Sequence, residues 1–156
     1  MATVVNDTGQ KYSQVPLSEQ MMLVKYVIQL IKDSGVFKGK GIKVNFLDAN
    51  KDCICIRLTD DNIKTSEYVD GSYDAQIRFM VISRHLNVSG VSGHINAMDE
   101  INQLGMLFDS IDYYDIENDR VYIDSIDQVS NAGVVYRDSS GIEDNGATFV
   151  LRYSKK

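Results

Sequence analysis

Seven carboxylates crowd one short stretch in the last third of the chain. They are Asp109, Asp112, Asp115, Glu117, Asp119, Asp124 and Asp127. Carboxylates at this density can bind a cation, exchange protons in pairs or face a charged polymer. Their spacing fits neither a calcium-binding loop nor the carboxylate pair of a glycosidase. Two interpretations stay open: a solvated loop followed by the outer face of a strand, or an acidic wall presented to a negatively charged polymer.

The histidines offer little for nucleophilic catalysis. His85 and His94 are the only two in the chain. A Ser-His-Asp arrangement would have to recruit Ser83 or Ser92, and the G-x-S-x-G pattern of a nucleophile elbow is missing. We expect His85 at the end of a strand and His94 on the solvent side of a helix. The sequence therefore predicts no catalytic residue and no enzyme.

The two cysteines, Cys53 and Cys55, are separated by a single residue. In a strand such residues share a face and lie roughly 6.5 Å apart, near the upper limit for a disulfide. We expect two reduced thiols inside a sheet, which is typical of a cytosolic protein. A metal centre would need more ligands than two cysteines and two unsupported histidines supply. No metal site is predicted.

A glycine-rich segment, Gly90-Val91-Ser92-Gly93, precedes a predicted helix. A helix N-terminus can hold an anion, and an ordinary capping loop is the competing interpretation. The chain contains neither the phosphate-binding pattern G-x-x-x-x-G-K-[ST] nor a G-x-G-x-x-G motif between a strand and a helix. No cofactor is predicted.

The overall charge argues against a protein that grips nucleic acid. The chain of 156 residues carries 22 acidic and 16 basic residues, a formal net charge of -6. Broad phosphate binding needs a basic footprint, whereas an acidic wall suits DNA that passes close by without being held. The apolar run at 21–31 is interrupted by Lys25 and Gln29 and is too short to span a bilayer. We expect no signal peptide and no membrane insertion.

Two helices are predicted to carry apolar stripes. The first runs from an N-cap at Ser18 to about residue 33 and is ended by Gly35. The second covers 95–108, where apolar residues recur every three or four positions. These residues are Ile95, Met98, Ile101, Leu104 and Phe108. Such stripes are made for packing on a sheet.

Strands are predicted between and after the helices. Segments 42–48 and 53–59 are expected to form a hairpin joined by residues 48–52. A weaker strand covers 65–69, and 73–84 alternates apolar and polar residues over its whole length. Two more strands are expected at 121–126 and 148–153. The segments 138–141 and 143–146 are predicted to be turns.

This order of elements predicts an α+β fold, with an antiparallel or mixed sheet and two helices packed on one face. Residues 1–16 are expected to form a polar N-terminal arm, and 17–156 a single domain. Tyrosines are frequent in the last third, where they fit either a protein interface or ordinary strand positions equally well. They are Tyr113, Tyr114, Tyr122, Tyr136 and Tyr153.

The second half of the chain resembles a known pattern. A long alternating strand at 73–79 precedes the amphipathic helix at 95–108. A strand, a wandering segment with Arg137-Asp138-Ser139-Ser140-Gly141 and Asp144-Asn145-Gly146, and a last strand at 149–153 follow. This pattern resembles the tail terminator, or tail completion, proteins of long-tailed bacteriophages. It is most similar to the minor capsid group in phages of Gram-positive bacteria, and covers roughly residues 17–154 in element order.

The resemblance implies a structural virion protein made in the host cytoplasm and placed at the tail–head junction. Such proteins form a hexameric ring that caps the tail tube, contacts the major tail tube protein and joins it to the head-completion or connector protein. DNA passes through the lumen without specific binding. The resemblance would place the acidic stretch at 109–127 near that lumen.

Two other functions stay open from the residues themselves. A small hydrolase could use carboxylates of the acidic stretch, and would need a concave pocket where they converge near 112–127. A monomeric adaptor binding one host protein is the other. A ring-forming subunit differs from both, because it should present a strand edge or loop left unsatisfied in the single chain.

Overall fold

The protein is described from a computed structural model, which describes residues 3–5, 11–37, 40–49, 51–59, 62–86, 88 and 90–156. The helices are α1 (Leu17–Ser34), α2 (Gly90–Ser110) and the short 3₁₀ helix η1 (Glu117–Asp119). The strands are β1 (Thr3–Val5), β2 (Lys11–Ser13), β3 (Gly41–Val44), β4 (Cys53–Leu58), β5 (Ile63–Glu67), β6 (Tyr73–His85), β7 (Val121–Gln128), β8 (Gly133–Arg137) and β9 (Glu143–Lys155).

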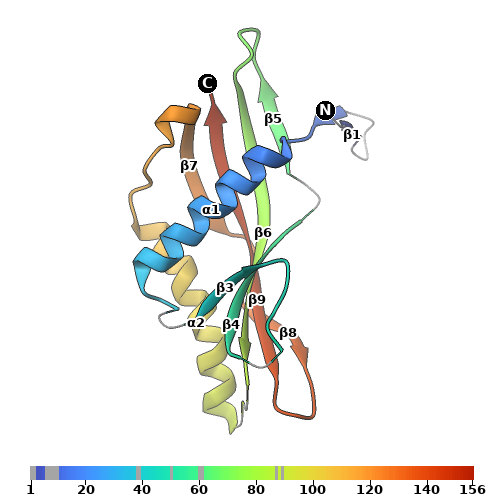
Figure 1. Cartoon of the computed structure of the whole chain (residues 1–156), viewed down its shortest axis with the longest axis vertical. Helices are drawn as coiled ribbons and strands as arrows, with labels where there is room; N and C mark the ends of the chain where they lie inside the picture. The colour runs from blue at the N-terminus through green and yellow to red at the C-terminus, as the bar shows by residue number, and fades with distance from the viewer. Residues whose placement is uncertain are drawn as a thin grey trace.

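Two long strands form the axis of the molecule. β6 and β9 pair antiparallel over 13 residues each, from Tyr73 opposite Lys155 to His85 opposite Glu143. β4 and β5 pair with different halves of the outer side of β6, and β8 and β7 do the same on β9. Figure 1 shows this ribbon running the length of the molecule with shorter strands at both ends. With β3 beyond β4, seven of the described strands form one mixed sheet.

The predicted hairpin between 42–48 and 53–59 is wrong. β3 and β4 lie side by side but run parallel, with Gly41 opposite Cys53 and Val44 opposite Ile56. A tight hairpin can only join antiparallel strands, so the connection between β3 and β4 is not a hairpin turn. Within that connection, the backbone N–H of Asp48 donates to Sγ of Cys53 at 3.3 Å. The strands were recognised from their composition, but their relative direction was not.

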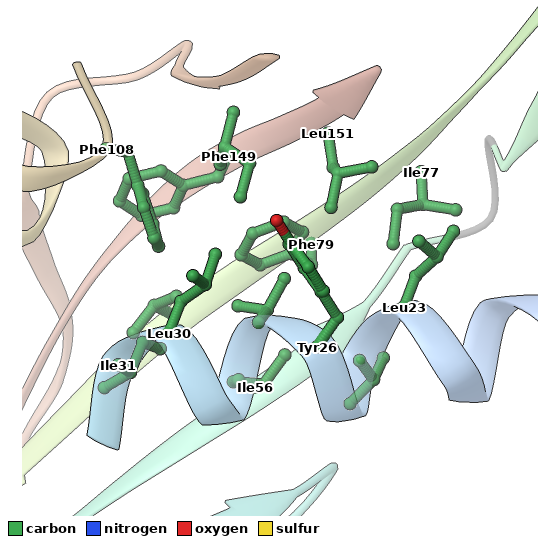
Figure 2. Packing of buried hydrophobic residues seen from close by; sticks show 14 of the residues in the cluster. Leu23, Tyr26, Leu30, Ile31, Ile56, Ile77, Phe79, Phe108, Phe149 and Leu151 are labelled. Atoms are coloured by element: carbon green, nitrogen blue, oxygen red, sulfur yellow. The ribbon is translucent and has the colours of Figure 1, made fainter. Parts of the chain in front are cut away.

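The hydrophobic core lies between one face of the sheet and the two helices. Alternate residues of β6 and β9 point to this face, among them Phe79 and Phe149, which are opposite each other and stack at 5.7 Å between ring centroids. Phe108 of α2 meets Phe149 edge-on. Figure 2 shows side chains of α1, including Tyr26 and Leu30, directed at the same strands. The α+β class with two helices over one face is confirmed.

The ends of α1 follow different rules. Gly35 ends the helix in the left-handed conformation, with φ of 73°, as predicted. The N-cap is Pro16 rather than Ser18, and no side chain caps the helix. The carbonyl of Pro16 accepts the N–H groups of Glu19 and Gln20, each at 3.1 Å. With Pro16 as the N-cap, the helix therefore starts two residues earlier than an N-cap at Ser18 would allow.

α2 begins earlier than predicted. It starts at Gly90, whose φ of 74° turns the chain into the helix. Ile101, Leu104 and Phe108 are buried as expected, but Ile95 is exposed. The apolar spacing was therefore read correctly for the second half of α2 only. Within the described residues, no helix is both long and apolar enough to cross a bilayer.

The largest boundary error concerns β9. Residues 143–146 were predicted to be a turn, yet Glu143, Asp144 and Asn145 are buried strand residues. The carboxylates of Glu143 and Asp144 are tolerated inside because partners reach them, as described below. The neighbouring turn at 138–141 is confirmed: Oδ1 of Asp138 accepts the N–H groups of Ser140 and Ile142.

The N-terminal segment forms a small sheet of its own that is joined to the large sheet by an isolated bridge. β1 and β2 pair antiparallel, and Gln14 forms an isolated bridge with Ile63 of β5. Val15 is buried and its N–H donates to the carbonyl of Asn62 at 3.0 Å. The described part of the predicted arm therefore contains two paired strands. Residues 1–2 and 6–10 of the predicted arm lie outside the described residues.

Candidate functional site

The acidic stretch lies along one side of the molecule. Asp109 lies in the last turn of α2, the next residues lie in the connection that contains η1, and the last belong to β7. Six of the seven carboxylate residues are exposed, and Asp127 is partly buried. The exposed six are Asp109, Asp112, Asp115, Glu117, Asp119 and Asp124. Solvated carboxylates at this density give this side a negative potential.

Two of these acids have structural contacts. Oδ1 of Asp115 accepts the backbone N–H of Ile123 at 3.0 Å, which caps the outer edge of β7. Oδ2 of Asp127 accepts Nη1 of Arg152 at 2.8 Å, a half-exposed ion pair. The acidic stretch is thus partly a cover for a strand edge and partly a free charged surface.

The seven acids do not all line one pocket, although Asp115, Glu117 and Asp119 border the same depression. Asp109 borders a depression with Gln128 and Asn131, and Asp124 borders another with Arg152 and Tyr122. A third depression, of about 360 Å³, is lined by residues 114–119. Among the described residues, no three His, Cys, Asp or Glu side chains gather closely enough to hold a metal ion. The pocket-lining carboxylates are thus divided among three depressions, with three of them around the third.

The two histidines join carboxylates at the opposite end of the sheet. Nε2 of His85 lies 2.7 Å from Oε2 of Glu100 on α2, and Nζ of Lys40 donates to both oxygens of Glu100 at 2.7 and 2.9 Å. Burial acts to raise the pKa of Glu100, but its hydrogen bonds to His85 and Lys40 lower that pKa below its usual value. These contacts connect α2 to β6 and to the start of β3.

His94 forms the second pair. Its Nδ1 lies 2.7 Å from Oε1 of Glu143, which also accepts Nε of Arg137 at 2.8 Å. Nδ2 of Asn145 donates to the other oxygen of Glu143 at 3.1 Å. The prediction that His94 faces solvent is therefore only partly right, since its side chain is 33% exposed and rests on a buried carboxylate. His85 ends β6, as predicted.

Sequence reasoning missed this polar network. Glu143 and Asn145 are two residues apart, and continuing the alternation of Ala147 and Phe149 backwards would have placed them on the buried face. The polar composition of 143–146 favoured a turn instead, so this alternation was not used to predict a strand. The partners come from α2 and β8, and no local pattern reveals them. The contacts of Glu143 with His94 and Arg137 join α2 and β8 to β9, while Oδ1 of Asn145 is buried without a hydrogen-bond partner.

The cysteines behave as predicted. Cys53 and Cys55 are free thiols, and both are buried on the face of the sheet opposite the helices. Burial is the main cause of the raised pKa of the Cys55 thiol. The tyrosines divide: Tyr153 belongs to the core, Tyr113 is partly buried, and Tyr114, Tyr122 and Tyr136 are exposed.

The strands at the sides of the sheet are not equally covered. β5 is bridged by Gln14, and β7 is covered by a bridge between Ile116 and Val121 and by Asp115. Among the described residues, no strand pairs with the outer edges of β3 and β8. β8 also exposes Val134, Val135 and Tyr136, at 45–47% of their surface. An open, apolar strand edge is a feature that natural single-chain proteins usually avoid.

Comparison of the sequence with models of known protein families gave no match, and comparison with curated proteins gave none either.

Proposed function

We propose that this protein is a structural subunit of a ring, similar to the tail terminator proteins of long-tailed bacteriophages. In this role it caps the tail tube and joins it to the head connector. The observation that carries the proposal is the pair of open strand edges, β3 and β8, on opposite sides of one sheet. Edges of this kind serve repeated head-to-tail contacts, and such contacts close into rings when the rotation between copies permits.

The acidic surface supports the same role. Exposed carboxylates along 109–124 repel a phosphate backbone, so a lumen that they border would let DNA slide without sticking. The net charge of -6 agrees with a conduit rather than a clamp. In the proposed assembly, the major tail tube protein and the head-completion protein are the axial partners, and six copies are what the resemblance implies.

Negative-stain images of the purified chain, with and without purified tail tubes, test the proposal. We expect rings with a central opening, either free or seated on tube ends. Mass photometry on the same samples gives the copy number. Only monomers in both samples would contradict the proposed function.

A further inference from the structure

We propose that β8 of one copy pairs antiparallel with β3 of the next copy, so that neighbouring sheets join edge to edge. This inference rests on the proposed ring and specifies its contact. The partner is a second copy of this chain. Four observations carry the proposal: which edges are free, their height along the sheet, their direction and the side chains they expose.

The free edges are selected by what covers the others. The outer edge of β5 receives Gln14, and that of β7 receives Ile116 and the carboxylate of Asp115. Within the part of the chain that the structure describes, β3 and β8 have a partner strand on one side only. The N–H and C=O groups on the other side are available to pair with another strand.

The two free edges lie at the same height. Gly41 and Val44 of β3 are level, through β4, with Arg84 and Val81 of β6. Gly133 and Arg137 of β8 are level, through β9, with Ile82 and His85 of β6. Figure 1 shows β3 and β8 on opposite sides of the same end of the ribbon. A copy rotated about an axis parallel to these strands therefore brings its β3 level with the β8 of its neighbour.

The strand directions match as well. β8 and β6 both run antiparallel to β9, so they share a direction. β3 is parallel to β4, which is antiparallel to β6, so β3 runs opposite to β8. Rotation about an axis parallel to the strands preserves these directions, and the contact between copies is then antiparallel. Antiparallel pairs are the commoner and slightly more stable type.

Exposed apolar side chains accompany both edges. Val134 and Tyr136 lie on the two faces of β8, because they are opposite Asn145 and Asp144 of β9. Phe46, 58% exposed, lies two residues after the end of β3, and Nζ of Lys43 lies 5.8 Å from the centre of its ring. At the same end, the first turns of α2 expose Val91 and Ile95, which would enlarge the contact.

A second copy fits these edges better than a foreign strand does. A foreign strand would pair with one edge and leave the other open, whereas a copy carries the complementary edge at the required height and direction. The contact also leaves the acidic surface free, since β7 pairs with residues 149–155 of β9 and β8 with residues 143–146. The ring can therefore form without burying Asp124 or its neighbours.

Charged substitutions on β8 test the contact. In native mass spectrometry of the full chain, we expect Val134→Lys and Tyr136→Lys each to lower the ratio of multimer to monomer by at least tenfold. Val69→Lys, in the turn between β5 and β6 at the other end of the molecule, is the matched control and should leave multimers unchanged. Circular dichroism establishes that each variant folds.

Cross-linking provides a second measurement that does not weaken the edge. Lys43 and Tyr136 lie on the face opposite the helices, by their register with Cys55 and Asp144. We expect a mixture of Lys43→Cys chains and Tyr136→Cys chains to give disulfide-linked pairs under mild oxidation, and each variant alone to give few. Self-linking of Tyr136→Cys alone, at the yield of the mixture, would show a twofold contact and overturn the proposal.

The outcomes separate this inference from the proposed function. If the wild type forms rings, both lysine variants form them equally well and no mixed cross-link appears, the β8–β3 contact is overturned and the proposed ring stands. A wild-type chain that stays monomeric with and without tail tubes would overturn both. Loss of rings in Val134→Lys and Tyr136→Lys but not in Val69→Lys, together with the mixed cross-link, supports both.

Discussion

Arg84 of β6 and Asp144 of β9 lie directly opposite each other and form a bidentate ion pair, with Nε–Oδ1 and Nη2–Oδ2 distances of 2.8 Å. The side chain of Asp144 is 4% exposed. The hydrogen bonds that Arg84 donates to Asp144 raise the pKa of Arg84 above its usual value, which keeps the guanidinium charged in a largely buried position.

Removing one member of this pair should destabilise the protein strongly. Arg84→Met leaves the Asp144 carboxylate buried without its partner, and we expect a loss of about 3–5 kcal/mol in the free energy of unfolding. Urea denaturation measures the loss. Arg152→Met is the matched control, because it breaks the half-exposed pair with Asp127 and should cost only about 0–1 kcal/mol. Equal losses in the two variants would contradict the buried role of Arg84.

The Glu143 network predicts a specific acid sensitivity. Burial acts to raise the pKa of Glu143, but hydrogen bonds from Asn145, Arg137 and His94 together lower that pKa below its usual value. The folded state therefore favours the carboxylate. Its stabilising contribution is complete above the unfolded-state pKa of about 4.3. It is lost as the pH falls through the lower folded-state pKa.

The same sign holds for Glu100, whose pKa is also lowered. We expect the free energy of unfolding to fall below about pH 4.5. Glu143→Gln should be less stable than the wild type at pH 7, and the difference should shrink at pH 3. Asp109→Asn, at an exposed position, is the control and should follow the wild-type profile. A parallel profile for Glu143→Gln and the wild type would contradict the prediction.

Gly146 marks a close approach between strands. A Cβ at this position would lie 3.0 Å from Cγ2 of Val135 and 3.2 Å from the backbone oxygen of Val81. Because a backbone oxygen cannot move aside easily, we expect Gly146→Ala to cost about 1–3 kcal/mol in thermal or urea unfolding. Gly133→Ala is the matched control, since no atom lies within 4 Å of its Cβ. A Gly146→Ala variant as stable as Gly133→Ala would contradict this packing.

The buried cysteines should react only after unfolding. Cys53 and Cys55 are 2% and 0% exposed, and burial is the first cause of the raised pKa of Cys55. We expect thiol labelling at pH 8 to be at least about a hundredfold slower in the folded protein than in 6 M urea, because reaction needs an opening of the sheet. Rapid labelling of either thiol in the folded protein would contradict the cover that the structure gives it.

The sequence was sufficient where neighbours along the chain settle the outcome. The alternation of β6, the apolar stripe of α1 and the stop at Gly35 are local patterns, and each was predicted close to its observed bounds. The turn at 138–141 has the same origin, because Asp138 holds it with its own side chain. The acidic stretch at 109–127 is visible from composition alone, since seven carboxylates fall within it.

Features whose partners come from distant segments were decided only by the tertiary structure. β3 and β4 have strand composition, but their parallel pairing depends on how each of them meets its neighbours in the sheet. Residues 143–145 look like a turn because polar residues rarely enter a core without partners. Here Arg84, Arg137 and His94 supply those partners across 60, 6 and 49 positions. The common height and the opposite directions of β3 and β8 depend on every strand pairing that connects them, which no single segment encodes.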